Sequence, residues 1–375
     1  MPRMIVDLRS DTVTHPTAEM REAMFRAEVG DDAYHEDPNI NKLEAMAAER
    51  MGKEAAVYVP SGRMGNASAV YAHTHHKGAL VIERQGHINL YERQGIEFFQ
   101  RIKFIVIDAP SGILDPSVVD QTLGDARAQG EDVRLLCLEN THNIAGGIVM
   151  PVERMAELAE VARRHGLKVH LDGARIFNAA TALKVDVKDI ARLADSVMFC
   201  LSKGLAAPVG SLVVGSKEFI KEARVARHLL GGQLRQAGVL AAAGIVALNK
   251  MTGRLQEDHD NARLLAEAMS KMPGLRVDLT RVMSNIFMAW AESKPKADRL
   301  VALAEEEGVR FRSFDSVFAD RPAEPAGLNA GHAGLPIGKN IGGMMRLVTH
   351  KDVNREGILY AIDVIRQCMD AVNRG

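Results

Sequence analysis

Excess charge of either sign, cysteine and long apolar runs are all scarce in this chain of 375 residues. Its 47 basic and 48 acidic side chains leave a formal net charge of −1, which gives no reason to expect nucleic acid or an anionic membrane as a partner. No stretch approaches the roughly 20 apolar residues of a membrane-spanning helix. With 47% hydrophobic and 25% charged residues, the composition is that of a globular protein, and a small-molecule substrate fits it better.

The three cysteines, Cys137, Cys200 and Cys368, are far apart in the sequence. None forms a C-x-x-C or similar spacing, so we expect no metal site. Two lie in the apolar runs LLCLEN and VMFCLS, where a small buried thiol is the usual role. The first residues, MPRMIVDLRSDTVTHP, lack the apolar core of a secretory signal. We therefore expect a reduced, cytoplasmic setting.

Short apolar segments alternate with helical patterns through the first two-thirds of the chain. Strands are predicted at 55–60, 78–83, 104–109, 134–140, 168–172, 196–202 and 211–215. Several are apolar nearly throughout, as strands covered on both faces are. The clearest helix begins at Pro151 and ends before Gly166, with Met155, Leu158 and Ala162 along one stripe. The alternation predicts an α/β fold with a mainly parallel central sheet and helices on both faces.

After about residue 250 the pattern changes, because a charge-rich helical segment is followed by short strand candidates. We therefore expect a large domain of residues 1–250, which includes an N-terminal arm. A smaller C-terminal α+β domain is expected over residues 251–375. The segment 319–340, rich in Pro, Gly and Ala, is predicted to be a loop.

Two chemically distinctive residues follow predicted strands. Asp172 ends KVHLD, where the chain turns through Gly173, and Lys203 directly follows SVMFCLS. Ligands of parallel α/β sheets gather at the carboxyl edge. The 31 positions from Asp172 to Lys203 leave room for a helix and a return strand, so both side chains can emerge on the same edge.

This arrangement of a lysine and an aspartate suits pyridoxal phosphate. A lysine amine can form an imine with an aldehyde cofactor. A carboxylate near the pyridine nitrogen keeps that nitrogen protonated, so the ring can accept electrons. Either residue alone would be interpreted as a solvated lysine or a capping aspartate, and it is their shared position that favours the cofactor.

Three further positions belong to the expected site. Ser61 and Gly62 form a turn before an Ala-rich helix, whose first N–H groups can hold a phosphate that Gly62 allows to approach closely. His87 can stack over the ring and transfer protons, although an ordinary turn histidine is an equal alternative. His142, in LENTHN, is a second candidate base, with a purely structural polar role equally open.

Asp172, Lys203 and His142 lie within longer motifs, and further motifs accompany them. The whole set is DLRSDTVTHPT, VGDDAYHEDPNINKLE, LENTHNIAGG, HLDGARIFNAA, FCLSKGLAAPVGS and RQAGVLAAAG. Together they resemble the low-specificity L-threonine aldolases, in the group also called β-eliminating lyases. The likeness runs from about Asp7 to Ala243 and returns at MRLVTHKDV, and LDGAR followed by LSKG is its most specific part. It implies the aspartate-aminotransferase-like fold, fold type I of the pyridoxal phosphate enzymes.

The resemblance implies a role for each matched cofactor residue. Lys203 is similar to the lysine that bonds the cofactor, Asp172 to the partner of the ring nitrogen, and His87 to the histidine stacked on the ring. Arg235 is similar to an arginine that reaches a phosphate across a subunit interface. Family members are usually homotetramers whose active sites are completed by a neighbouring chain.

The substrate carboxylate group implied by the resemblance consists of Ser10, Arg175 and Arg346, of which Arg175 is also counted with the cofactor. Arginine suits this task because its planar fork binds both carboxylate oxygens. Two positions depart from the family pattern. Arg63 stands where the phosphate turn usually has threonine, and this cation can bind phosphate or reach a substrate group. Gln233 stands where glycine is usual, and both changes leave the preferred substrate open.

We therefore expect a pyridoxal phosphate-dependent aldolase that cleaves L-threonine, L-allo-threonine and related β-hydroxy-α-amino acids to glycine and an aldehyde. The base for the β-hydroxyl proton would be His87, His142 or a held water. β-Elimination or racemisation at the same site is the main alternative, and a cofactor-binding homologue without turnover is a third. The sequence does not rank threonine against allo-threonine or phenylserine.

Overall fold

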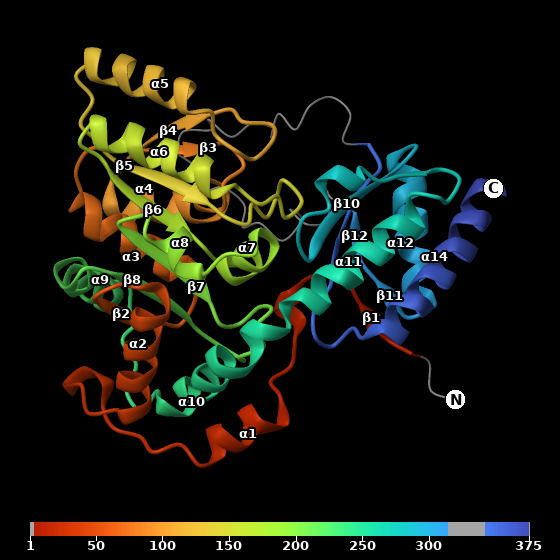
Figure 1. Cartoon of the computed structure of the whole chain (residues 1–375), viewed down its shortest axis with the longest axis horizontal. Helices are drawn as coiled ribbons and strands as arrows, with labels where there is room; N and C mark the ends of the chain where they lie inside the picture. The colour runs from red at the N-terminus through yellow and green to blue at the C-terminus, as the bar shows by residue number, and fades with distance from the viewer. Residues whose placement is uncertain (1–3, 314–341, 375) are drawn as a thin grey trace. The chain divides into compact units, whose positions relative to one another are not determined.

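The computed structural model describes residues 4–313 and 342–374. These form two compact units, a large unit of Thr14–Gln256 and a small unit of Met1–Val13 with Glu257–Gly375 (Figure 1). The first residues thus belong to the small unit and not to the large domain in which the sequence analysis placed them. The physical reason is strand pairing, because β1 (Val6–Asp7) pairs in parallel with β11 (Val309–Arg310). The predicted loop 319–340 lies outside the described residues.

A seven-stranded sheet in the order β2-β8-β7-β6-β5-β3-β4 forms the centre of the large unit. Its strands are β2 (Ala55–Val59), β3 (Ala79–Glu83), β4 (Lys103–Ile107), β5 (Val133–Glu139), β6 (Lys168–Asp172), β7 (Ser196–Cys200) and β8 (Ser211–Gly215). Each corresponds to one of the seven apolar segments predicted as strands. Within this sheet only β8 runs antiparallel to its neighbours. The prediction of an α/β fold with a mainly parallel sheet is confirmed.

Helices of the large unit lie on both faces of this sheet. The helices of the unit are α1 (Ala18–Phe25), α2 (Pro38–Met51), α3 (Gly62–Thr74), α4 (Arg93–Gln100), α5 (Pro116–Ala128), α6 (Val152–Arg164), α7 (Ile176–Leu183), α8 (Val187–Ala191), α9 (Lys217–Leu229) and α10 (Gly238–Val246). α5 and α6 lie side by side on one face, and α3 and α9 on the other (Figure 1). Along β7, Val197 and Phe199 join the core on the α6 side, whereas Met198 and Cys200 join the core on the α3 side. This alternation is the period of two of a strand that is buried on both faces.

Local sequence signals set the ends of α6, which begins one residue after the predicted start. Pro151 is its N-cap, and the chain turns away at Gly166, whose φ of 74° is a left-handed conformation that glycine adopts readily. Met155 and Leu158 are fully buried on its inner face. The three cysteines are free and buried, as the apolar runs around Cys137 and Cys200 predict for those two.

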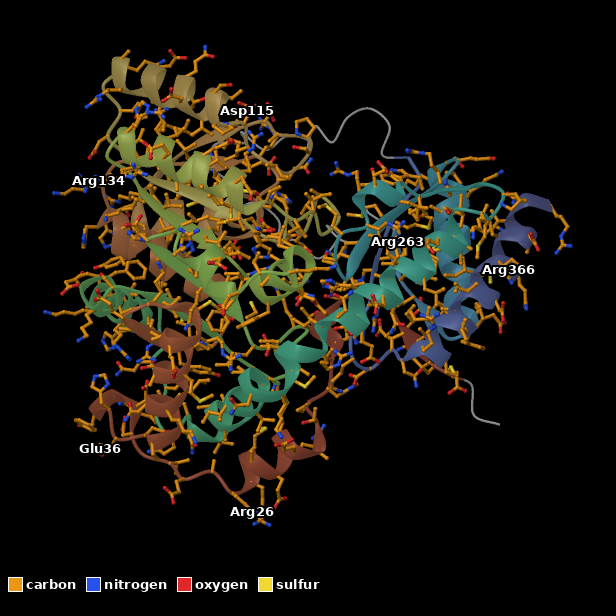
Figure 2. The ribbon with its side chains drawn as sticks, viewed as in Figure 1. Arg26, Glu36, Asp115, Arg134, Arg263 and Arg366 are labelled. Atoms are coloured by element: carbon orange, nitrogen blue, oxygen red, sulfur yellow. The ribbon has the colours of Figure 1, made fainter. Side chains whose placement is uncertain are left out.

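The small unit contains a four-stranded antiparallel sheet in the order β12-β13-β10-β9. Its strands are β9 (Leu275–Arg276), β10 (Ile286–Ala291), β12 (Arg312–Ser313) and β13 (Met344–Val348), and its helices include α12 (Lys294–Glu306) and α14 (Arg355–Arg374). α11 (Leu255–Met269) begins within the large unit and continues into the small one. Phe287, Leu300, Met345 and Ile365 form part of one core. Charged side chains such as Arg366 point outward from it (Figure 2).

No helix among residues 4–313 and 342–374 combines the length and the apolar character that crossing a membrane requires.

Replacing Gly65 by alanine tests how closely α3 packs on the sheet. A Cβ atom at Gly65 would lie 2.7 Å from Cγ of Met198 and 3.1 Å from Cγ2 of Val213, so neighbouring side chains must shift. We expect Gly65→Ala to lower the free energy of unfolding by about 1–3 kcal/mol. A Cβ atom at Gly124, in α5, would meet nothing within 4 Å, so Gly124→Ala should raise it by about 0.5–1 kcal/mol. Urea denaturation measures both changes, and equal values would contradict this packing.

Candidate functional site

Asp172 and Lys203 lie at the same edge of the central sheet. Asp172 is the last residue of β6, and Lys203 comes three residues after the end of the neighbouring strand β7. Because β6 and β7 are parallel, both residues lie at the carboxyl edge. Lys203 is close enough to lower the pKa of Asp172 by its charge. Its carbonyl oxygen accepts hydrogen bonds from Thr14 Oγ1 at 2.9 Å and from the N–H of Ala206 at 2.8 Å, which hold the backbone of this turn.

The Asp172 carboxylate is buried and held at both oxygens. Asn66 Nδ2 donates to Oδ2 at 2.8 Å, and the N–H of Ala174 donates to Oδ1 at 3.0 Å. Burial raises the pKa of Asp172 above its ordinary value, and the nearby carboxylates of Glu139 and Glu92 raise it further. A cation placed against this carboxylate would therefore be stabilised strongly.

His87 lies beside Asp172 and is oriented by two carboxylates. Its backbone N–H donates to Glu139 Oε2 at 2.6 Å, and its Nδ1 lies 2.9 Å from Glu92 Oε1. Burial lowers the pKa of His87, but the carboxylates of Glu92 and Asp172 together outweigh burial, so the pKa is raised. One face of the ring packs on Tyr91, with centroids 4.4 Å apart. Within the described residues nothing hydrogen-bonds to Nε2, so this nitrogen can meet a ligand.

His142 is differently placed, because both of its ring nitrogens are engaged inside the protein. The N–H of Ala145 donates to Nδ1 at 3.2 Å, and Nε2 lies 3.0 Å from Glu83 Oε2. An Nδ1 atom that accepts leaves the hydrogen on Nε2, which donates to Glu83. The ring is 2% exposed and presents no lone pair to a substrate, which supports the structural alternative of the sequence analysis.

A narrow pocket reaches this region. It is lined by Asp172 and both histidines, with Glu83, Glu139 and Cys137 among its other walls. Among the residues described, no group of His, Cys, Asp and Glu side chains is arranged to hold a metal ion.

The predicted phosphate turn is the N-terminus of α3. Ser61 is the N-cap, and its Oγ accepts the N–H of Met64 at 3.3 Å. A Cβ atom at Gly62 would lie 2.9 Å from Sγ of Cys200, so a residue without a side chain lets this turn approach β7. Arg63 is exposed, and its guanidinium carbon lies 5.3 Å from the centre of the Tyr91 ring. Arg63 thus contacts the residue that supports His87.

The two other predicted arginines of the large unit differ in exposure. Arg175 directly precedes α7, is buried, and donates from Nη1 to Asn143 Oδ1 at 3.4 Å. The side chain of Arg235 is 66% exposed, and its Nη1 lies 3.6 Å from Asp31 Oδ1. An exposed arginine at this position is available to a second molecule.

Ser10 and Arg346 belong to the small unit, where the structure brings their segments together. Arg346 lies on β13 and donates from Nη2 to the carbonyl oxygen of Arg9 at 3.3 Å. Ser10 Oγ accepts the N–H of Thr12 at 3.2 Å. Contact between residues 9 and 346 could not be read from local sequence patterns.

The residues that orient Asp172 and His87 were not predicted from the sequence. Asn66 is a polar residue on the sheet-facing side of α3, beside apolar residues such as Ala69 and Val70, and this is a signal that could have found it. Glu92 follows His87 by five residues, but the intervening turn is a π-helix (Ile88–Glu92), a rare conformation that sequence patterns do not predict.

The sequence and the fold are both similar to those of known proteins. Low-specificity L-threonine aldolase 1 of Arabidopsis thaliana is 46% identical over 310 residues, which cover 81% of this chain and 87% of that protein. The low specificity L-threonine aldolase of Escherichia coli strain K12 is 39% identical over 353 residues, which cover 94% and 96%. The solved threonine aldolase of Leishmania major has the same fold, with a TM-score of 0.75 at 17% identity and coverage of 98% and 99%. Residues 7–292 match the family described as beta-eliminating lyase, and this chain therefore belongs to the beta-eliminating lyase family.

Proposed function

We propose that this chain is a pyridoxal phosphate-dependent aldolase that cleaves L-threonine, L-allo-threonine and related β-hydroxy-α-amino acids to glycine and an aldehyde. The observation that carries the proposal is the placement of Asp172 and Lys203 at the ends of neighbouring parallel strands. The proposed activity is inferred from two relatives that are named low-specificity L-threonine aldolase and are 46% and 39% identical to this chain.

The residues present fit this cofactor. Asp172 is a buried carboxylate whose pKa is raised by burial and by Glu139. A protonated ring nitrogen beside it would supply a positive charge that stabilises the ionised carboxylate. The Ser61–Gly62 turn leads into the first N–H groups of α3, and a helix N-terminus is the environment that a phosphate requires. His87 keeps Nε2 available beside the same carboxylate.

When bound, pyridoxal phosphate supplies a protonated aromatic ring that withdraws electrons from the α-carbon of the amino acid. The contribution of Asp172 is to hold the proton on the ring nitrogen. Lys203 would supply the amine that holds the cofactor through its aldehyde group. Ser61, Gly62 and Arg63 form the phosphate turn.

Arg175 is proposed to bind the substrate carboxylate, and the family resemblance extends the same role to Ser10 and Arg346. A fixed carboxylate orients the bond that must break, and a correct orientation supplies a large part of the rate. His87 is the better candidate for the β-hydroxyl base, because its Nε2 is available whereas both nitrogens of His142 are engaged. Its Nδ1 faces Glu92, which stabilises the imidazolium after proton uptake.

A homotetramer in the cytoplasm completes the proposal. Large apolar side chains are exposed at Phe25 (85%), Tyr34 (74%) and Leu229 (62%). The segments of Tyr34 and Leu229 adjoin, because the buried Asp32–Arg227 ion pair of 2.8 Å joins the loop before α2 to α9. Large exposed apolar side chains are typical of subunit interfaces. The charged ends of Arg26 and Glu36 are turned outward (Figure 2). Free, buried cysteines support a reducing compartment.

Covalent trapping tests the role of Lys203. Borohydride reduction of the enzyme loaded with pyridoxal phosphate should fix the cofactor irreversibly on the peptide that contains Lys203, as mass spectrometry detects. We expect Lys203→Ala to abolish this label and to lower kcat at least about 10³-fold, since the amine acts in a covalent step. Lys168→Ala, at the opposite end of β6, is the matched control and should keep the label.

The products identify the reaction. Glycine and acetaldehyde from threonine support the aldolase, whereas a keto acid and ammonia would show β-elimination. Label on Lys203 with no product from any β-hydroxy amino acid would show binding without turnover. Label at another lysine would refute the assignment of the site.

The pH profile tests the contact between His87 and Glu92. Burial lowers the pKa of His87 and Glu92 raises it, so Glu92→Gln should leave burial dominant and lower this pKa. Neutral His87, the form that accepts a proton, then persists to lower pH. We expect the acidic limb of kcat/KM for threonine to move to lower pH in Glu92→Gln. Glu97→Gln, which breaks only a surface pair with Arg93, should leave the profile unchanged. A static acidic limb in Glu92→Gln would exclude His87 as the base.

Light scattering tests the oligomer. Wild-type protein should have the mass of four chains, and Phe25→Asp should shift it to smaller species, because burial of a charge in an apolar interface is costly. Leu359→Asp, at an apolar position in α14 that is 51% exposed, is the control and should not change the mass. A monomeric wild-type protein would refute the tetramer.

A further inference from the structure

A continuous row of hydrogen-bonded polar side chains runs behind Asp172, between α3 and the sheet. Asn66 Nδ2 donates to Asp172 Oδ2 at 2.8 Å, and Asn66 Oδ1 lies 3.2 Å from His170 Nε2. His170 Nδ1 lies 2.8 Å from Ser196 Oγ, which in turn lies 2.7 Å from His73 Nε2. Asn66, His170 and Ser196 are 0% exposed. We call Asn66, His170, Ser196 and His73 the relay.

The fold accounts for this row. Asn66 and His73 are seven residues apart on α3, which places them two turns apart on the same face of the helix. His170 and Asp172 are two residues apart on β6, so their side chains leave the same face of the sheet. His170 pairs in register with Ser196 of β7. The relay therefore runs from the carboxyl edge toward the opposite edge, beneath α3.

The direction of each hydrogen bond follows from the carboxylate. An ionised Asp172 can only accept, so Asn66 turns its NH₂ group toward it and its oxygen toward His170. His170 must then carry its hydrogen on Nε2. Burial lowers the pKa of His170 to about 3, so at neutral pH its Nδ1 is a bare acceptor for the hydroxyl of Ser196. Burial likewise lowers the pKa of His73 to about 4, and its neutral ring donates from Nε2 to the serine oxygen.

Every donor in the relay thus points toward Asp172. We propose that Asn66 and His170, with Ser196 and His73 behind them, are positioning residues that fix the rotation of the Asp172 carboxylate and stabilise its negative charge against the cofactor's ring nitrogen. The inference rests on the proposed function, because it concerns how Asp172 performs its role there.

The charges around Asp172 explain why its ionised form needs the hydrogen bonds of the relay. The nearby charges are the carboxylates of Glu139 and Glu92, which oppose ionisation of Asp172, and the side chains of His87 and Lys203, which favour it. A protonated Asp172 would donate a hydrogen bond to the ring nitrogen and would not keep that nitrogen protonated. The two ends of the Asn66 amide are almost equal in shape. The hydrogen on His170 favours the orientation in which the NH₂ group faces Asp172 and also Glu92, whose Oε1 lies 3.3 Å from Asn66 Nδ2. Without His170, the amide could present its oxygen to Asp172 and repel it.

Two variants and two controls test the relay in the enzyme loaded with pyridoxal phosphate. Asn66→Leu and His170→Phe remove the donors at similar volume. His170→Gln keeps an N–H donor toward Asn66, and Ser68→Ala changes a buried hydroxyl on α3 outside the relay. The readouts are the dissociation constant of pyridoxal phosphate and the protonation of its ring nitrogen, followed by solid-state NMR with nitrogen-15 in the ring as the pH is raised.

We expect Asn66→Leu and His170→Phe to weaken cofactor binding about 10- to 100-fold, the change expected when a buried charge loses one hydrogen bond. The ring nitrogen should lose its proton at a lower pH than in wild type. His170→Gln and Ser68→Ala should behave as wild type in both measurements. If a bulky variant does not fold, Ser196→Ala takes its place as the test, because it removes only one oxygen atom. In this variant too the ring nitrogen should lose its proton at a lower pH than in wild type.

Ring-nitrogen titrations that are identical in wild type and in all folded relay variants would overturn the proposal and leave the row as structural packing only. Failure of the proposed function is a separate result, since wild-type protein would then bind no pyridoxal phosphate at Lys203, and the relay proposal would fall with it.

Discussion

The buried carboxylate of Asp172 is the constraint on which the site depends. Removal of a carboxylate from water costs several kcal/mol unless it is compensated, and here Glu139 and Glu92 add like charge. Asn66 and Ala174 donate hydrogen bonds to the two oxygens, and the side chains of Lys203 and His87 nearby favour the ionised form of Asp172. The protein alone compensates the negative charge of this site only in part, and a bound cationic ring would compensate the remainder. The unfavourable electrostatic free energy of the site is therefore tied to its function.

The sheet delivers this arrangement by simple geometry. Parallel pairing of β6 with β7 brings Asp172 and the Lys203 turn to one edge, and the period of two along β6 turns His170 to the same face as Asp172. α3 lies across that face, so one helix supplies the proposed phosphate turn at Gly62 and the partner of Asp172 at Asn66. A displacement of α3 relative to the sheet would disturb both contacts at once. The close approach at Gly62 and Gly65 limits such movement.

The sequence was sufficient for features that depend on local patterns. The strands of the central sheet are continuous apolar segments. Asp172 and Lys203 could be predicted as site residues because they stand at the ends of two of these segments. The partners of these residues could not be predicted in the same way. Asn66 meets Asp172 across 106 positions, and Arg346 meets the Arg9 carbonyl across 337, so their pairing is set by tertiary packing. The pairing of β1 with β11 is equally non-local, which is why local patterns do not show that the first residues pair with residues of the small unit.

At Arg63 the resemblance described above implies a departure from the family pattern, while the pair of Asp172 and Lys203 is retained. A cation in the first turn of a helix is opposed by the helix dipole, so helix stability does not explain it. Its guanidinium instead lies over Tyr91, whose ring packs on His87, and an exposed contact of this type contributes about 0.5–1 kcal/mol. Asp172 and Asn66 are buried and tolerate little change, whereas Arg63 is exposed and reaches the site only through Tyr91. Variation at Arg63 therefore acts on the surroundings of His87, where the substrate's hydroxyl would be handled, and leaves the carboxylate that holds the ring nitrogen untouched.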